Sequence, residues 1–251
     1  MSTSPASSAT DDLRELRLHE RAAIRLAGDI VAGRLAPGDQ FPSAEEIVER
    51  FGFSRTVARE ALQTLSMLGL IRVQHGKRTE VRQQQDWNIL TPVMQEAFRR
   101  ENQLEPIWRD LYEFRLLIEP GAAKLVAMRG SERDLAQLVE LADEMRALAE
   151  DAANARRVLL TDQAFHELIA RACANRVLAG VSRSFWDAVS VLWLESHLSR
   201  EELGAVAQQH QQIAEAIARR DGDAAARAME AHLRTASTMD VGHLARDAAR
   251  S

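Results

Sequence analysis

Residues 30–81 read IVAGRLAPGDQFPSAEEIVERFGFSRTVAREALQTLSMLGLIRVQHGKRTEV and lay out two short helices, a tight turn and a basic hairpin, in that order. Ser43 can cap the first helix through its hydroxyl, and Glu46 can complete a capping box three residues later. Gly52 ends this helix, and Ser54 can cap the next one after a short break. This order predicts a winged helix-turn-helix.

The second helix has the pattern of a recognition helix. Its apolar residues recur at helical spacing, which leaves Arg55, Thr56 and Arg59 free in its opening turn, and Gly69 ends it. A recognition helix presents its N-terminal residues to base edges, where an arginine fork matches the paired acceptors of guanine. We therefore expect these three residues to face DNA.

The hairpin that follows is expected from two β segments, residues 70–73 and 79–82, joined through residues 75–78, HGKR. From Arg50 to Arg82 the chain has seven cations and two carboxylates, a local net charge of +5, whereas the whole chain carries −5. Positive charge gathered on an acidic protein indicates a docking face for phosphates. A solvated helix and an ordinary hairpin could carry the same basic run, but the full order of helix, turn, helix and wing favours DNA binding.

Three segments of this stretch, GRLAPGDQFPS, FGFSRTVAREAL and LGLIRVQHGK, resemble the DNA-binding domain of the GntR family of bacterial transcription regulators. The resemblance implies two sets of DNA contacts, one on the recognition helix and one on a wing that enters the minor groove. They are Arg55, Thr56 and Arg59 on the helix, and His75, Gly76 and Lys77 on the wing. The family usually has Glu-Arg-Glu after its Pro-Ser, with the arginine touching DNA, but here Ala44-Glu45-Glu46 follows. Glu45 implies that this contact is missing or that the operator differs.

Length and composition bound the rest of the chain. Two domains are the natural expectation for 251 residues, and 46% apolar content is enough for a real core. Neither an apolar run long enough to span a membrane nor a cationic leader is evident, so we expect a cytoplasmic protein without membrane contact. Cys173 permits no internal disulfide, which fits a reducing compartment.

The domain organisation follows from changes in composition and periodicity. We expect a disordered tail over residues 1–10, the winged helix-turn-helix over 11–82, a linker over 83–91 and an all-helical domain over 92–243. The last should be an antiparallel bundle, with Pro120 kinking or splitting its second helix. Its helices are expected near residues 88–101, 106–129, 131–150, 154–173, 175–197, 199–220 and 222–240.

Four residues of the helical part form a candidate metal site. Asp162 and His166 are four apart on one expected helix and project together toward its apolar side. His210 leads one apolar stripe and His232 lies in another, so three helices could converge. A buried imidazole needs partners for both nitrogens, and a metal can satisfy one of them. Taken singly, each histidine could instead be a core residue with hydrogen-bond partners.

The segments DLYEFRLLIEPGAAKLVAMR, DQAFHELIARACANRVL and HQQIAEAIARRDGDAAARAMEAHL resemble the FCD effector domain of the FadR-like branch of the same family. In that branch one Asp and three His bind a divalent ion, which implies Asp162, His166, His210 and His232 as the ligands. Such a ligand set suits Zn, Ni, Mn or Fe. Cys173 is either a soft extra ligand or a small buried apolar residue.

Candidates for effector binding lie on the same helices. Arg115 can form a salt bridge with Glu119 at i+4 or meet an effector carboxylate, as resemblance to FCD proteins implies. Asn175 and Trp193 are weaker candidates, with capping or packing as the alternatives. The segment DWNILTP, residues 86–92, resembles the linker of sugar-acid-responsive members such as galactonate regulators.

Together these features predict a metabolite-responsive DNA-binding regulator, not an enzyme. We expect a homodimeric repressor that binds an inverted repeat and is released by a small carboxylate or sugar acid at the metal site. The alternative is a metal-dependent hydrolase or isomerase on a helical bundle, because metal-bound water is a ready nucleophile. The lack of a general base beside the four ligands disfavours it. A third hypothesis is a purely structural metal beside an unused pocket.

Overall fold

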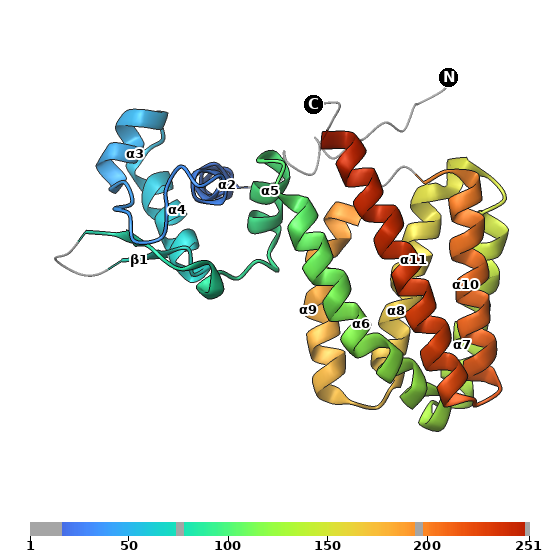
Figure 1. The fold of residues 1–251 in the computed structure, drawn as a ribbon. Coiled ribbons are helices and arrows are strands. Elements are labelled where there is room, and N and C mark those ends of the chain that lie inside the picture. Colours follow the sequence, from blue (N-terminus) through green and yellow to red (C-terminus); the bar gives the residue numbers. More distant parts are fainter. Residues whose placement is uncertain (1–16, 74–77, 194–197, 249–251) are drawn as a thin grey trace, which may run out of the picture. The chain divides into compact units, whose positions relative to one another are not determined.

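The computed structural model describes residues 17–73, 78–193 and 198–248 (Figure 1). Contacts between Cα atoms divide the chain into two compact units, with the boundary between Gln103 and Leu104. Helices dominate both units, and the two strands of the described residues belong to the first. None of the described helices combines the length and apolar character needed to cross a membrane.

The N-terminal unit is a winged helix-turn-helix followed by one more helix, so this part of the predicted fold is confirmed. The sequence did not predict its first helix, α2. The elements are α2 (Leu18–Val31), α3 (Ala44–Phe51), α4 (Arg55–Met67), β1 (Ile71–Arg72), β2 (Glu80–Val81), a 3-10 turn η1 (Gln84–Asp86) and α5 (Pro92–Arg100).

We call helices α3 and α4 with the turn between them the reading head. The ends of these helices are set by residues that lie close to them in the sequence. The Ser43 hydroxyl accepts from the backbone N–H of Glu46 at 3.2 Å, and the Glu46 carboxylate accepts from the N–H of Ser43 at 2.7 Å. Gly52 ends α3 in the left-handed conformation, with φ of 71°. Ser54 caps α4 by accepting from the N–H of Val57 at 3.2 Å. Both predicted caps and the predicted capping box are therefore present.

The wing contains a third segment that the sequence did not indicate. β1 and β2 pair antiparallel, with Ile71 opposite Val81, and are shorter than expected. The N–H of Val81 donates to the carbonyl of Asp39, and the N–H of Phe41 donates to the carbonyl of Thr79. The chain entering α3 is thereby fastened to the wing. The wing tip, residues 74–77, lies outside the described residues.

Helix α5 packs on α2 and belongs to the N-terminal unit by its contacts. From the sequence we expected this helix to belong to the all-helical domain, which was expected to begin at residue 92. Arg34 holds the end of α5 through a two-pronged ion pair, because its Nη1 and Nη2 donate to the Glu101 carboxylate at 2.9 and 3.0 Å. A Cβ atom added to Gly28 of α2 would lie 2.8 Å from the same carboxylate. A glycine at this position therefore leaves room for the ion pair.

The C-terminal unit is a bundle of six long helices among the described residues, so the predicted helical bundle is confirmed, whereas the first of its seven expected helices lies in the N-terminal unit as α5. Its helices α6 and α11 lie side by side over much of their length (Figure 1). Of the two effects expected of Pro120, kinking or splitting, the structure contradicts splitting, since α6 is unbroken there. The elements are α6 (Leu104–Arg129), α7 (Glu132–Leu148), a 3-10 turn η2 (Ala152–Asn154), α8 (Ala155–Ala172), α9 (Arg176–Trp193), α10 (Arg200–Ala218) and α11 (Gly222–Ala248).

Candidate metal centre and nucleic-acid interface

Four ligand-type side chains meet inside the helical bundle. Asp162 and His166 come from α8, His210 from α10 and His232 from α11, and each of the four residues is at most 2% exposed. One ligand atom from each lies within 4.8 Å of those of the other three. The structure therefore brings together all four residues that the sequence proposed as metal ligands.

The ring nitrogens that face one another are the Nε2 atoms. Nε2 of His166 lies 3.3 Å from Nε2 of His232 and 3.3 Å from Nε2 of His210. Oδ1 of Asp162 lies 3.0 Å from Nε2 of His210 and 3.9 Å from Nε2 of His166. Three nitrogens and one carboxylate oxygen thus surround one small volume.

Each imidazole faces an acceptor on its other side. Nδ1 of His210 lies 2.8 Å from the carbonyl oxygen of Val206, and Nδ1 of His232 lies 3.1 Å from the side-chain oxygen of Gln209. Nδ1 of His166 lies 2.6 Å from Oε2 of Glu119, although its N–H is not aligned as in an ideal hydrogen bond. Because these partners accept, we assign the ring proton to Nδ1, which leaves the Nε2 lone pairs directed at one another.

This donor set fits a divalent cation. Burial, followed by repulsion from His210 and His166, holds the pKa of His232 well below its usual value, and burial also lowers the pKa of His166. Both rings are therefore neutral at pH 7, which is the metal-binding form. Oδ2 of Asp162 is buried without a hydrogen-bond partner among the described residues. A cation among the four side chains would balance the converging lone pairs and this carboxylate.

Aromatic rings lie against the candidate metal ligands. The ring of Phe165 meets His210 edge to face, with centroids 4.9 Å apart, and Trp186 of α9 stacks on His166 at 5.6 Å. Trp186 was not singled out from the sequence. The Cys173 thiol is buried and donates to the carbonyl of Ala170, and this residue is not in the four-residue cluster. Its placement supports the small buried residue rather than the extra ligand.

Arg115 is buried near the candidate metal ligands and pairs with a carboxylate. Its Nε donates to Oε1 of Glu119 at 2.7 Å, and its guanidinium carbon lies 4.8 Å from the Trp186 ring centroid. Burial would raise the pKa of Glu119, but the charge of Arg115 and then the Nδ1–H of His166 stabilise the carboxylate and lower its pKa to about 2. The salt bridge considered from the sequence is therefore present. The contact of Arg115 with an effector stays a proposal.

The two weaker effector candidates differ in what the structure says of them. Asn175 is exposed, and its side-chain oxygen accepts from the N–H groups of Val177 and Leu178 at 3.1 and 3.2 Å. It therefore caps the start of α9, which was the alternative considered for it. The side chain of Trp193, at the end of α9, lies outside the described residues.

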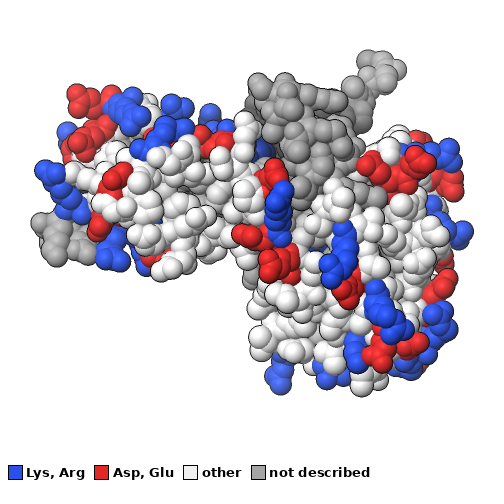
Figure 2. Space-filling model, in the orientation of Figure 1, with Lys and Arg blue, Asp and Glu red and all other residues white. Residues whose placement is uncertain are grey.

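The residues predicted to contact DNA lie at the start of α4. Arg55, Thr56 and Arg59 are exposed in the opening turns, and neither arginine pairs with a carboxylate within the described ranges. Figure 2 shows both cationic and acidic side chains near the base of the wing. His75, Gly76 and Lys77 of the wing lie outside the described residues, so their DNA contacts remain predictions.

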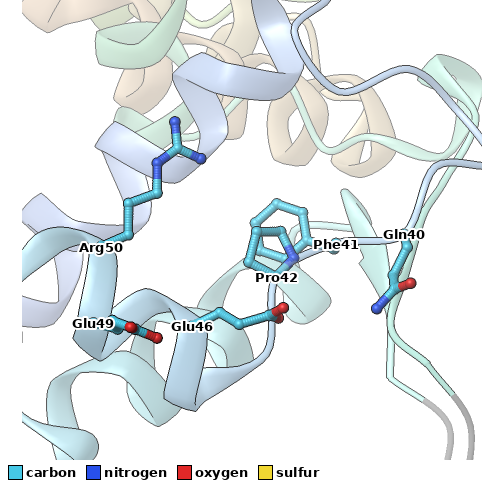
Figure 3. A pocket seen from close by; sticks show the side chains of 6 residues that line it. All are labelled: Gln40, Phe41, Pro42, Glu46, Glu49 and Arg50. Carbon is cyan, nitrogen blue, oxygen red and sulfur yellow. The ribbon is translucent and has the colours of Figure 1, made fainter.

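The first turn of helix α3 carries acidic side chains, whereas the first turns of α4 carry arginines. Glu45 is exposed in the first turn of α3, at the place where the family pattern has arginine. An open hollow beside the helix has Gln40 and Arg50 at opposite ends (Figure 3). Its lining also includes the apolar Phe41 and Pro42 and two carboxylates, Glu46 and Glu49. These carboxylates make this side of the reading head a poor match for phosphate.

Comparisons with known proteins agree with both parts of the fold. Residues 18–81 match the bacterial regulatory proteins of the gntR family, and residues 110–235 match the FCD domain. The uncharacterized HTH-type transcriptional regulator YieP of Escherichia coli is 33% identical over 85% of this chain and 91% of its own. The galactonate operon transcriptional repressor of the same organism is 30% identical over 83% of this chain and 90% of its own. The solved structure of the Lar protein of Listeria monocytogenes has the same fold, with a TM-score of 0.54 and 17% identity. The match covers 90% of this chain and 97% of the Lar chain.

Proposed function

Because this chain belongs to the GntR family of bacterial regulatory proteins and carries an FCD domain, we propose that it is a repressor released from DNA by a small organic acid. Family membership makes it a DNA-binding transcription regulator with an effector domain. The proposal adds the sign of regulation, the class of effector and the residues that bind it. The relative named for repression of a galactonate operon supports both a repressor and a sugar acid.

The observation that carries the proposal is the buried cluster of Asp162, His166, His210 and His232 with Arg115 close by. These four side chains would hold a divalent ion of the Zn, Ni, Mn or Fe class, which supplies positive charge and attracts a carboxylate when bound. The chain places a buried, permanently charged guanidinium beside them. An acid with one carboxylate toward the cluster and its remaining charge toward Arg115 would meet complementary groups at both ends.

We further propose that the protein binds its operator as a homodimer on an inverted repeat. Each chain carries one reading head, with Arg55, Thr56 and Arg59 exposed on α4, and the dyad of an operator commonly mirrors the dyad of the protein. His75, Gly76 and Lys77 would add minor-groove contacts from the wing. A footprint of two half-sites related by symmetry would support this arrangement.

An operator-binding titration tests the effector proposal. A panel of hydroxy and sugar acids that includes galactonate would be added to the protein–operator complex, using wild type, Arg115→Ala and metal-stripped protein. To lower operator binding a hundredfold, the acid must prefer the non-binding form by roughly 2.7 kcal/mol. We expect one acid to release wild type at a lower concentration than either altered form. Release of all three at one concentration would show that neither the metal nor Arg115 belongs to the sensor.

A further inference from the structure

Glu119 of α6 contacts both the metal centre and the arginine proposed to bind the effector. One carboxylate oxygen, Oε1, accepts from Nε of Arg115 at 2.7 Å. The other, Oε2, lies 2.6 Å from Nδ1 of His166. Arg115 Nη2 also reaches Oε2, at 3.5 Å, and all three residues are buried. Two groups with different expected roles therefore depend on one side chain.

The chemistry of the two neighbours requires a carboxylate between them. A guanidinium has donors and no acceptor, and Nδ1 of His166 is a donor when Nε2 faces the other ligands. Glu119 offers one oxygen to each. A glutamine of the same shape has one oxygen and one amide NH₂ group, so one of its two neighbours would face a donor instead. Since the three side chains are buried, water cannot readily make good that loss.

A second contact reinforces the same link. The ring of Trp186 stacks on His166 at 5.6 Å, and the guanidinium carbon of Arg115 lies 4.8 Å from the centroid of that ring. Displacing the guanidinium would therefore disturb both Glu119 and the ring that lies against His166. The Trp186 contact is apolar and does not depend on the protonated nitrogen of His166. Only the Glu119 contact is expected to fix which ring nitrogen carries the proton.

We propose that Glu119 is a positioning residue that holds His166 with its Nε2 toward the metal and couples this imidazole to Arg115. The inference rests on the proposed function for the roles of the metal and of Arg115. An anion that draws Arg115 away from Oε1 leaves more of the carboxylate charge for His166 Nδ1, which makes Nε2 more basic and raises metal affinity. By linkage, metal binding then raises anion affinity by the same factor.

The first test reads the imidazole itself. In the metal-free protein, long-range ¹⁵N–¹H spectra of the histidine rings report which nitrogen carries the proton. We expect Glu119→Gln to shift His166 away from the Nδ1–H form while His210 and His232, held by Val206 and Gln209, keep theirs. The matched control is Glu105→Gln, because Glu105 pairs with Arg109 at i+4 on the same helix but its side chain is 42% exposed. An unchanged His166 in Glu119→Gln would overturn the proposal.

The second test reads metal affinity by competition with a chromogenic Zn²⁺ chelator. Loss of an outer partner of a metal-binding histidine commonly lowers affinity about 10- to 100-fold, and we expect Glu119→Gln to fall in this range and Glu105→Gln to match wild type. Wild type that binds no Zn²⁺ would overturn the proposed metal centre itself. Normal Zn²⁺ binding by both wild type and Glu119→Gln would overturn only the role given to Glu119.

The coupling to Arg115 is tested by a double-mutant cycle that needs no effector. Removing the guanidinium with Arg115→Met changes Zn²⁺ affinity directly through its charge in either background, and this direct effect cancels in the cycle. We expect the change to differ by at least about twofold between the Glu119 and Glu119→Gln backgrounds. Should the double variant fail to fold, Arg115→Gln, which also removes the charge, supplies the same comparison. Equal changes in both backgrounds would show that Glu119 does not couple the two groups.

Discussion

Nδ1 of His210 lies 2.8 Å from the carbonyl oxygen of Val206, one helical turn earlier on α10. This acceptor belongs to the backbone, so the ring orientation is set by the helix that carries it. Nε2 of His210 consequently faces Asp162 at 3.0 Å without needing the other histidines. Among the proposed ligands, we therefore expect removal of His210 to disturb the other three side chains least, which makes it the best residue for testing the metal centre.

We expect His210→Ala to lower metal content and thermal stability together. A metal that binds only the folded chain adds stability by mass action, roughly 2.7 kcal/mol when it is present at a hundred times its Kd. Elemental analysis and thermal unfolding with and without EDTA would measure both effects, and the variant should lose its response to EDTA. Cys173→Ala is the control and should keep its metal. Unchanged metal stoichiometry in His210→Ala would remove this residue from the site.

Arg55 and Lys77 should contribute to DNA binding in different ways. Arg55 is exposed at the start of α4, so Arg55→Ala should relax base preference and cost about 1–3 kcal/mol at one operator position. Lys77, expected at the wing tip, should contact phosphate, so Lys77→Ala should weaken binding to all sequences and reduce the salt slope by about one unit. Operator titrations at several salt concentrations would separate the two. The same pattern from both variants would refute this division.

Gly28→Ala should loosen α5 even though alanine normally favours a helix. The new methyl group would meet the Glu101 carboxylate and push it from Arg34, which holds the end of α5. Hydrogen exchange over residues 92–100 should therefore become faster. Gly121→Ala is the control, because a Cβ there has no neighbour within 4 Å, and this substitution should stabilise its helix by roughly 0.5–1 kcal/mol. Unchanged exchange over residues 92–100 in Gly28→Ala would contradict the expected displacement.

The same ion pair predicts how α5 responds to acid. Hydrogen bonds from Arg34 lower the pKa of Glu101 despite the opposing effect of burial. A carboxyl with a lowered folded pKa contributes stability above its unfolded pKa, and this contribution is lost as pH falls through the folded value. Protection of α5 should thus persist through the ordinary carboxyl range and decline below it. In Glu101→Gln this decline in α5 protection at low pH should be absent. If the variant shows the same pH dependence as wild type, another group causes the decline.

Local chemistry explains what could be predicted from the sequence. Ser43, Gly52 and Ser54 act on neighbours within three or four residues, so their roles can be recognised without a fold. Helix α2 was missed because it begins after Arg17, whose side chain gives no cap hydrogen bond and no familiar N-cap signal. The pairing of Val81 with Asp39 joins segments that no periodicity relates.

The candidate site shows the same limit. The spacing of Asp162 and His166 indicated one face of a helix, but the contact of Glu119 with His166 depends on how α6 packs on α8. Trp186 and Trp193 are seven residues apart in the sequence, a spacing that helical periodicity assigns to one face. Periodicity therefore cannot say whether Trp186 lies against the candidate metal ligands, whereas the structure places it on His166.

Glu45 should make the operator of this protein differ from that of relatives with arginine at this position. Its carboxylate is exposed in the first turn of α3, where it favours the positive end of the helix and repels phosphate. Facing a base, it would accept from the amino group of cytosine, whereas arginine would prefer guanine. Selection of half-sites from random DNA should therefore give different base preferences for wild type and Glu45→Arg.

Glu49→Arg is the matched control for this prediction, because Glu49 is also exposed on α3, one turn further along. It makes the same change in charge away from the first turn, so it should raise affinity for all DNA sequences and steepen the salt dependence without changing the selected half-site. Glu45→Arg should raise affinity and steepen the salt dependence in the same way, and should also change the selected half-site. If the two variants select the half-site that wild type selects, Glu45 affects only the overall charge of the reading head, and operator choice rests with Arg55, Thr56 and Arg59 of α4.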